Sequence, residues 1–121
     1  MKNKNILNSF KYAFEGIWTA IKEERNLKIH ILIMILVIIF GIIFNISTFE
    51  WLVCILLFGG VISLELVNTA IETTVDLITM ERNPKAKFAK DISAGAVLVM
   101  AIISVVIGLI IFMPKILAWI K

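Results

Sequence analysis

The sequence of 121 residues contains a single cysteine, Cys54, which excludes a disulfide within the chain and leaves cysteine-based zinc or iron–sulfur sites without ligands. Because Cys54 lies inside an apolar run, we expect it to serve packing. Charged residues make up only 17% of the chain, against roughly a quarter in soluble proteins. The phosphate-binding loop GxxxxGK[ST] and the glycine-rich loop of protein kinases are both missing. Nothing therefore indicates a soluble nucleotide-binding fold.

Apolar residues, in contrast, make up 60% of the sequence and give it a mean hydropathy of +1.00. A soluble domain of this size could not bury so much apolar side chain, so we expect an all-α membrane protein. Three stretches come close to the roughly 20 residues that span a bilayer core. We expect a single domain over residues 1–121, with transmembrane helices at about 28–46, 50–81 and 90–119.

A further helix is expected before the first span, over about residues 5–24, because apolar residues recur there at helical spacing. Its other side is largely polar, which predicts an amphipathic helix on the membrane surface. The pair Asn83-Pro84 is expected to break the helix that leaves the second span. Ser93 belongs to a run of small residues in the third span, which we assign to close helix packing.

The basic residues are distributed unevenly along the chain. Those before the first span are Lys2, Lys4, Lys11, Lys22, Arg25 and Lys28, and those between the second and third spans are Arg82, Lys85, Lys87 and Lys90. The link NISTFE between the first two spans has none. Because basic loops stay in the cytoplasm, the N-terminus is expected inside and the C-terminus outside. The net charge of +3 thus sets orientation, and no nucleic-acid partner is expected.

Within the second span, the segment ELVNTAIETTVD places polar residues three or four positions apart. At about 100° per residue, these side chains project within a stripe roughly 100° wide on one helix face. Its residues are Glu65, Asn68, Thr69, Glu72 and Asp76. A carboxylate inside the hydrocarbon costs a few kcal/mol at least, so it usually faces a bundle interior and has a task. A cation or a proton is expected to be shared among these carboxylates.

Two more polar clusters should lie at the cytoplasmic interface. Glu23 and Glu24 end the surface helix, and Lys90-Asp91 opens the third span. Magnesium is often held by only one or two carboxylates together with substrate phosphates, and lysine supplies a charge suited to phosphate. The pattern therefore suits a metal-bound phosphate compound that approaches from the cytoplasm and a substrate that reaches Glu65 from the lipid.

ELVNTAIETTVD resembles the pattern Glu-x-x-Asn-(Ser/Thr)-Ala-Ile-Glu-x-x-(Val)-Asp of the prokaryotic integral-membrane diacylglycerol kinases, a family that includes the undecaprenol kinases of Gram-positive bacteria. The segments KEERN and AKDISAGAVL support the resemblance, which covers nearly the whole chain. It implies transfer of the ATP γ-phosphoryl group to a lipid alcohol in the bacterial cytoplasmic membrane. It also implies a multi-pass homotrimer whose active sites combine residues of neighbouring subunits.

Carried over position by position, the resemblance implies that Glu65 is the general base that takes the proton of the lipid hydroxyl. Glu24 and Glu72 would hold Mg²⁺ bridging the ATP phosphates. Which of Glu23 and Glu24 faces the metal follows only from the family pattern, so Glu23 is given a supporting role.

Other positions are assigned to the nucleotide and to support. Asn68 and Asp76 would support the metal site, Lys90 would contact phosphate, and Asp91 would orient Lys90 or help to bind nucleotide. His30, in the segment ERNLKIH, is expected to contact the nucleotide, with an interfacial imidazole as the alternative. That segment is closer to the Gram-positive branch, which favours undecaprenol over diacylglycerol as acceptor.

Two other classes of function remain open. In a small oligomeric cation or proton transporter, Glu65 would bind and release a cation; such a protein should also carry polar residues along the outer half of its path, where the first and third spans offer almost none. A membrane scaffold subunit would leave the carboxylate stripe unexplained. Oligomerisation is expected in any case, because three helices cannot enclose so polar a face against lipid.

Overall fold

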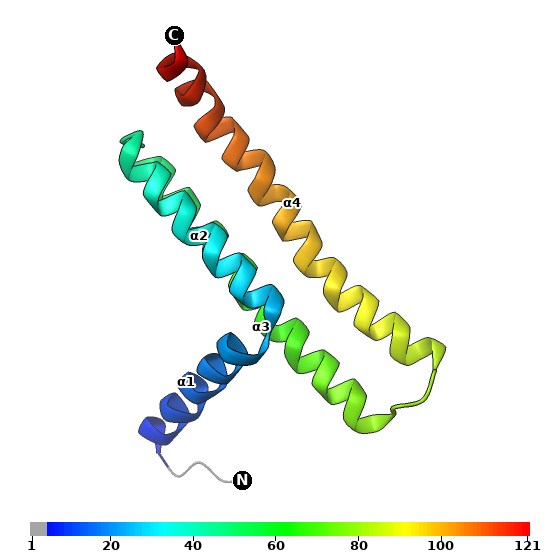
Figure 1. Cartoon of the computed structure of the whole chain (residues 1–121). Coiled ribbons are helices and arrows are strands. Elements are labelled where there is room, and N and C mark those ends of the chain that lie inside the picture. Colours follow the sequence, from blue (N-terminus) through cyan, green and yellow to red (C-terminus); the bar gives the residue numbers. More distant parts are fainter. Residues whose placement is uncertain (1–4) are drawn as a thin grey trace.

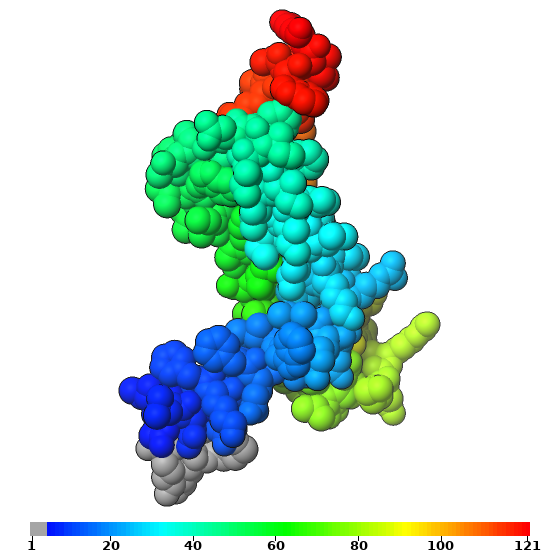
Figure 2. Space-filling view, turned by 60° about the vertical axis from the view of Figure 1, so that its left-hand side comes forward, coloured from blue at the N-terminus to red at the C-terminus, as the bar shows by residue number. Residues whose placement is uncertain are grey.

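The computed structural model describes residues 5–121, and in that range the chain forms four α-helices without a β-strand. They are α1 (Ile6–Glu23), α2 (Arg25–Ile43), α3 (Thr48–Ile78) and α4 (Pro84–Ile120). Helices α2, α3 and α4 form an elongated bundle, and α1 projects sideways from the start of α2, beyond which α3 and α4 continue (Figures 1 and 2). The expected all-α class is confirmed. Lys2 and Lys4, two of the basic residues used to predict orientation, lie outside the described residues.

Helices α2, α3 and α4 are each long and apolar enough to cross a membrane, which confirms the expected three spans. Most of their large apolar side chains are exposed in the single chain, as expected for surfaces that face lipid or other subunits. With 31 residues, α3 is about 46 Å long and exceeds a hydrocarbon core of about 30 Å. One end of α3 therefore extends into a more polar layer.

A single non-helical residue, Glu24, separates α1 from α2. Its φ and ψ of −95° and 115° are extended, and its N–H donates to the Ala20 carbonyl at 2.8 Å. Asn5 caps the other end of α1, where its side chain accepts from the Asn8 N–H at 2.9 Å. The chain thus turns sharply at Glu24, which places this carboxylate at the joint of the two helices.

The connection between α2 and α3 is short and locally determined. Helix α2 ends at Ile43 rather than near residue 46, because Asn45 adopts a positive φ of 51°, a conformation that asparagine tolerates better than most residues. Ser47 and Glu50 then form a reciprocal capping box, with bonds of 2.9 and 3.1 Å, that starts α3 at Thr48. This connection defines the α2–α3 end of the bundle.

The opposite end carries the connection between α3 and α4, a little beyond the point where α1 leaves the bundle (Figure 1). This part of the bundle, from the α1–α2 joint to the α3–α4 connection, is called the α1 end. Helix α3 ends at Ile78 rather than near residue 81, and α4 begins at Pro84 rather than near residue 90. Asn83 caps α4 by accepting from the N–H groups of Lys85 and Ala86, and Pro84 suits the first helical position. The charged segment before residue 90 is therefore helical, so α4 extends beyond the apolar stretch that predicted it.

The apolar core lies toward the α2–α3 end. Its buried residues are Ile46, Cys54 and Ile111, and Cys54 packs there as expected. The Trp51 ring lies so close to Gly41 that a Cβ at Gly41 would come within 2.6 Å of it. A glycine is thus required where α2 meets this indole. This cluster is remote from the buried polar residues, which lie nearer the α1 end; there Leu27, in the first turn of α2, is only 1% exposed.

Candidate active site

The buried polar side chains of the described residues gather on one face of α3 and on the adjoining part of α4. Glu65 is 2% exposed, Asn68 5% and Ser93 8%. The spacing of three and four residues places Glu65, Asn68 and Glu72 on one side of α3. Asp76 continues this stripe into an exposed position. The polar face thus runs from the interior of the bundle to its surface.

The Glu65 carboxylate meets the His30 imidazole of α2. Oε2 of Glu65 lies 3.5 Å from Nε2 of His30, and the two side chains are 3% and 20% exposed. His30 was grouped with the nucleotide contacts in the sequence analysis, but the structure places it beside the predicted base. A carboxylate so deep in a membrane helix needs such a polar partner.

A chain of hydrogen bonds orients Glu72. The Ser93 hydroxyl donates to Oδ1 of Asn68 at 2.6 Å, and Nδ2 of Asn68 donates to Oε1 of Glu72 at 2.8 Å. Because Ser93 engages the amide oxygen, the Asn68 nitrogen must point toward Glu72. The other carboxylate oxygen of Glu72 is left available at a half-buried position.

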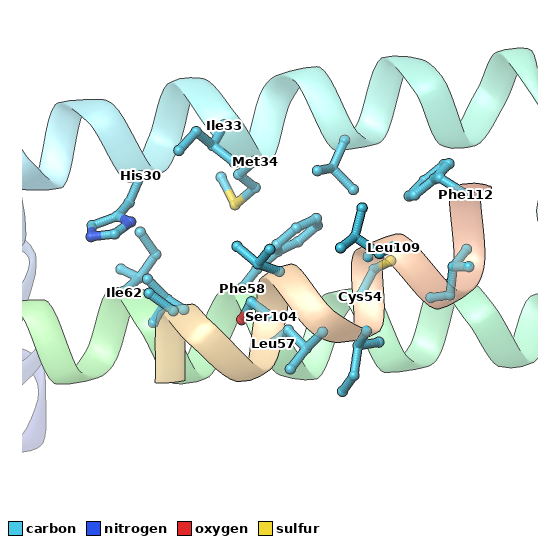
Figure 3. Close-up of a pocket in the computed structure, with 17 residues that line it drawn as sticks. His30, Ile33, Met34, Cys54, Leu57, Phe58, Ile62, Ser104, Leu109 and Phe112 are labelled. Carbon is cyan, nitrogen blue, oxygen red and sulfur yellow. The ribbon is translucent and has the colours of Figure 1, made fainter. Parts of the chain in front are cut away.

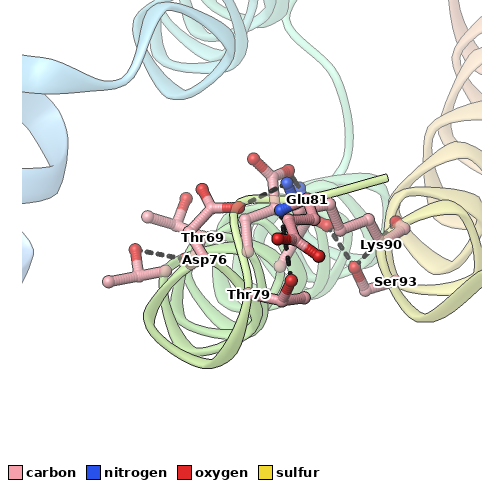
Figure 4. A network of polar contacts seen from close by, with 9 residues as sticks. Thr69, Asp76, Thr79, Glu81, Lys90 and Ser93 are labelled. Carbon is pink, nitrogen blue, oxygen red and sulfur yellow. Dashed lines mark hydrogen bonds and ion pairs between the residues drawn. The ribbon is translucent and has the colours of Figure 1, made fainter. Parts of the chain in front are cut away.

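Nearer the end of α3, an ion pair joins the two helices at their surface. Nζ of Lys90 lies 2.5 Å from Oδ1 of Asp76, as Figure 4 shows with Ser93 on the same side of α4. Asp91 points elsewhere and pairs with Lys87 one turn earlier at 2.6 Å. The structure therefore brings Lys90 to the carboxylate stripe but leaves Asp91 outside it.

The predicted metal ligands lie on different elements. Glu24 is half-buried at the joint of α1 and α2, Glu72 is half-buried on α3, and Glu23 is exposed. Residues 5–121 of one chain contain no group of three side chains placed to bind a metal ion. Magnesium accepts one or two carboxylates when substrate phosphates supply further oxygens. The oriented carboxylate of Glu72 fits that requirement.

An apolar cavity of about 330 Å³ lies between α2, α3 and α4, with His30 toward one end and Phe112 toward the other (Figure 3). Apart from His30 and Ser104, its lining is apolar, and Met34, Phe58 and Leu109 are among the lining residues. The imidazole thus lies between the buried carboxylate and a space that suits a hydrocarbon chain.

Sequence reasoning missed the role of Ser93, which it assigned to helix packing. The structure shows it buried and bonded to Asn68, 25 residues earlier in the chain. A signal was present, since Ser93 follows Lys90 and Asp91 within AKDISAG, a segment that supports the resemblance. One sequence nevertheless does not reveal which residue of α3 it meets.

Together, three membrane-spanning helices and a partly buried carboxylate stripe define a multi-pass membrane protein with a polar site between its helices. Comparison with known proteins narrows this class. The family model for prokaryotic diacylglycerol kinase matches residues 11–112. The undecaprenol kinase of Bacillus subtilis is 50% identical over 117 residues, which cover 93% of this chain and 95% of that protein.

Two diacylglycerol kinases are also related to this chain. That of Synechocystis is 37% identical over 94% of this chain and 66% of its own length, and that of Pseudomonas aeruginosa is 32% identical over 77% and 76%. The chain therefore belongs to the prokaryotic diacylglycerol kinase family and is a bacterial membrane protein. The resemblance found in the sequence is confirmed, including its closer relation to the Gram-positive undecaprenol kinases.

Proposed function

We propose that this protein is a lipid kinase that transfers the γ-phosphoryl group of ATP to undecaprenol, with diacylglycerol as the second candidate acceptor. One observation carries the proposal: a buried carboxylate, Glu65, shares a helix face with the oriented carboxylate of Glu72. The 50% identity to an undecaprenol kinase supports this acceptor. The whole chain, residues 1–121, would act as one kinase domain.

Glu65 is the general base of this reaction. Oε2 faces His30, so Oε1 is left to accept the proton of the lipid hydroxyl. As the proton moves to Glu65, the lipid oxygen bonds to the γ-phosphorus and the bond to the leaving ADP breaks. Phosphoryl transfer requires mainly positioning and charge neutralisation, which a small site can supply.

Glu72 and Glu24 hold the metal. Glu72 lies seven residues from Glu65, or about 10 Å along α3, which separates the base from the phosphate-binding region. When bound there, Mg²⁺ would neutralise part of the negative charge of the ATP phosphates. Asn68 orients Glu72, and Glu23 supports the neighbouring Glu24.

Lys90 and Asp91 serve the nucleotide. Lys90 contacts phosphate once ATP is present, and Asp76, its partner in the structure, holds the ammonium near the site until then. Exchange of an exposed carboxylate for a phosphate costs little, because ion pairs at the surface contribute little to stability. Asp91 lies one residue further along α4, where it helps to bind nucleotide.

The arrangement in the membrane follows from the charges. The α1 end, with its basic residues, faces the cytoplasm, so the N-terminus lies inside and the C-terminus outside. Helix α1 lies on the membrane surface, with its apolar side chains against lipid; Leu7, Phe10 and Trp18 are all exposed in the single chain. A homotrimer, with sites shared between subunits, covers the remaining polar face.

The test is lipid phosphorylation by the full-length protein in vesicles with Mg-ATP and either undecaprenol or diacylglycerol. We expect undecaprenol to be phosphorylated, and diacylglycerol to be phosphorylated more slowly or not at all. A higher rate with diacylglycerol would make diacylglycerol the preferred acceptor instead of undecaprenol. No phosphorylated lipid from either, combined with cation flux across the vesicle membrane, would support the transporter instead.

A further inference from the structure

Glu65 has only one polar side-chain contact among residues 5–121, and it is a loose one. The carboxylate lies 3.5 Å from the His30 imidazole, and its side chain is 3% exposed. By comparison, Glu72 receives a hydrogen bond of 2.8 Å from Asn68. A buried carboxylate with so little support depends strongly on the partner that it does have.

The imidazole is a suitable partner for a base. An imidazole N–H can donate one hydrogen bond to a carboxylate oxygen. The contact between α2 and α3 thus holds one oxygen of the carboxylate, Oε2, and leaves Oε1 for a substrate.

The position of His30 also argues against direct contact with the nucleotide phosphates. The ion pair of Asp76 and Lys90 lies 11 residues beyond Glu65 along α3, or roughly 16 Å. His30 instead lines the apolar cavity (Figure 3). It lies on the side from which a lipid alcohol, not ATP, would approach Glu65.

We propose that His30 is a positioning residue for the base: its Nε2–H donates a hydrogen bond to Oε2 of Glu65 and directs Oε1 toward the acceptor hydroxyl. The inference rests on the proposed kinase function. His30 keeps its proton throughout, while the hydroxyl proton passes to Glu65 and the phosphoryl group to the lipid oxygen.

Two substitutions separate hydrogen bonding from packing. His30→Gln keeps an N–H donor near the position of Nε2 but loses the ring, whereas His30→Phe keeps a ring of similar size but loses the donor. We expect His30→Phe to lower kcat by about ten- to a hundredfold, the range for losing a hydrogen bond to a charged group. His30→Gln should recover most of that loss. The KM for Mg-ATP should stay within about twofold for both, since ground-state binding of the nucleotide is untouched.

The control is Ile29→Phe, which adds the same ring one residue earlier at an exposed position of α2, and it should leave kcat unchanged. If His30→Phe does not fold, as judged by detergent-stable oligomer size, His30→Asn replaces it, because its amide is too short to reach Glu65. The proposal would be overturned if the donor-free variant were as active as His30→Gln. A raised KM for Mg-ATP at unchanged kcat would also overturn it and assign His30 to the nucleotide.

These outcomes differ from a failure of the kinase function itself. If the wild-type protein phosphorylated neither lipid, the proposed function would fall and the inference with it. If the wild type were active and all variants matched it, only the role of His30 would fall.

Discussion

Glu50 and Glu65 are both carboxylates of α3 that face a basic residue of another helix, but they lie toward opposite ends of the bundle. Glu50 accepts from Nζ of Lys115 at 2.8 Å and from the Ser47 N–H at 2.9 Å. Glu65 is more deeply buried, and within residues 5–121 its carboxylate has one polar side-chain partner, His30, at 3.5 Å. A carboxylate with several short bonds is fixed in place, whereas one with few partners remains available for a reaction. The number of bonds thus fits a structural role for Glu50 and the proposed role of base for Glu65.

The largest effect is expected from removing the charge of each carboxylate in turn. Glu65→Gln should lower the rate of lipid phosphorylation by about a thousandfold, since a general base contributes about 10²–10⁴. Glu50→Gln should retain nearly the full rate. Initial rates of lipid phosphorylation in vesicles measure the effect of each substitution. Equal losses of rate in the two variants would contradict the assignment of Glu65 to catalysis and Glu50 to structure.

The metal ligand should show the next largest effect. Glu72→Gln is expected to lower kcat by about a hundredfold and to raise the Mg²⁺ concentration needed for half-maximal rate, because an amide is a weaker ligand for a hard cation. Glu81→Gln, an exposed residue in the loop after α3, is the matched control. A Mg²⁺ dependence that stayed unchanged in Glu72→Gln would remove Glu72 from the metal site.

A smaller effect is expected from Ser93, which acts through Asn68. Ser93→Ala removes the bond that holds the Asn68 amide, so that Glu72 is less well oriented. We expect a loss of about three- to tenfold in kcat, in line with one neutral hydrogen bond. Ser93→Thr, which keeps the hydroxyl, should lose less. An alanine variant more active than the threonine variant would show that Ser93 matters for packing alone.

The smallest effect on activity is expected at the α2–α3 end. Lys115→Met breaks the ion pair with Glu50 and should lower the unfolding free energy slightly while leaving the rate unchanged. Adding Glu50→Gln should restore part of that stability, because the uncompensated carboxylate is then gone. Thermal unfolding of the single and double variants checks this; a fall in kcat without a change in stability would be inconsistent with a structural pair.

Patterns within single stretches of sequence predicted the membrane spans and the polar residues that α3 contributes to the candidate site. The spacing of Glu65, Asn68, Glu72 and Asp76 placed the polar stripe on one face of α3, and the structure buries its first two members. Apolar length predicted three spans because backbone groups in lipid must be satisfied within a helix. Such properties depend on residues close together in the chain.

Contacts between helices could not be predicted in the same way. His30 meets Glu65, and Ser93 meets Asn68, only because α2, α3 and α4 pack in a particular register. Helix ends also escaped prediction where capping overrode hydropathy. Asn83 starts α4 well before its apolar stretch, since a cap and a proline at the first position suffice to begin a helix.

The most direct measurement follows the γ-phosphoryl group of labelled ATP in vesicles that contain undecaprenol and diacylglycerol together. Wild type, Glu65→Gln and Glu50→Gln would be compared at saturating Mg²⁺. We predict label in undecaprenol for the wild type and Glu50→Gln, and almost none for Glu65→Gln. Full labelling by Glu65→Gln, or no labelled lipid from folded wild-type protein, would contradict the account.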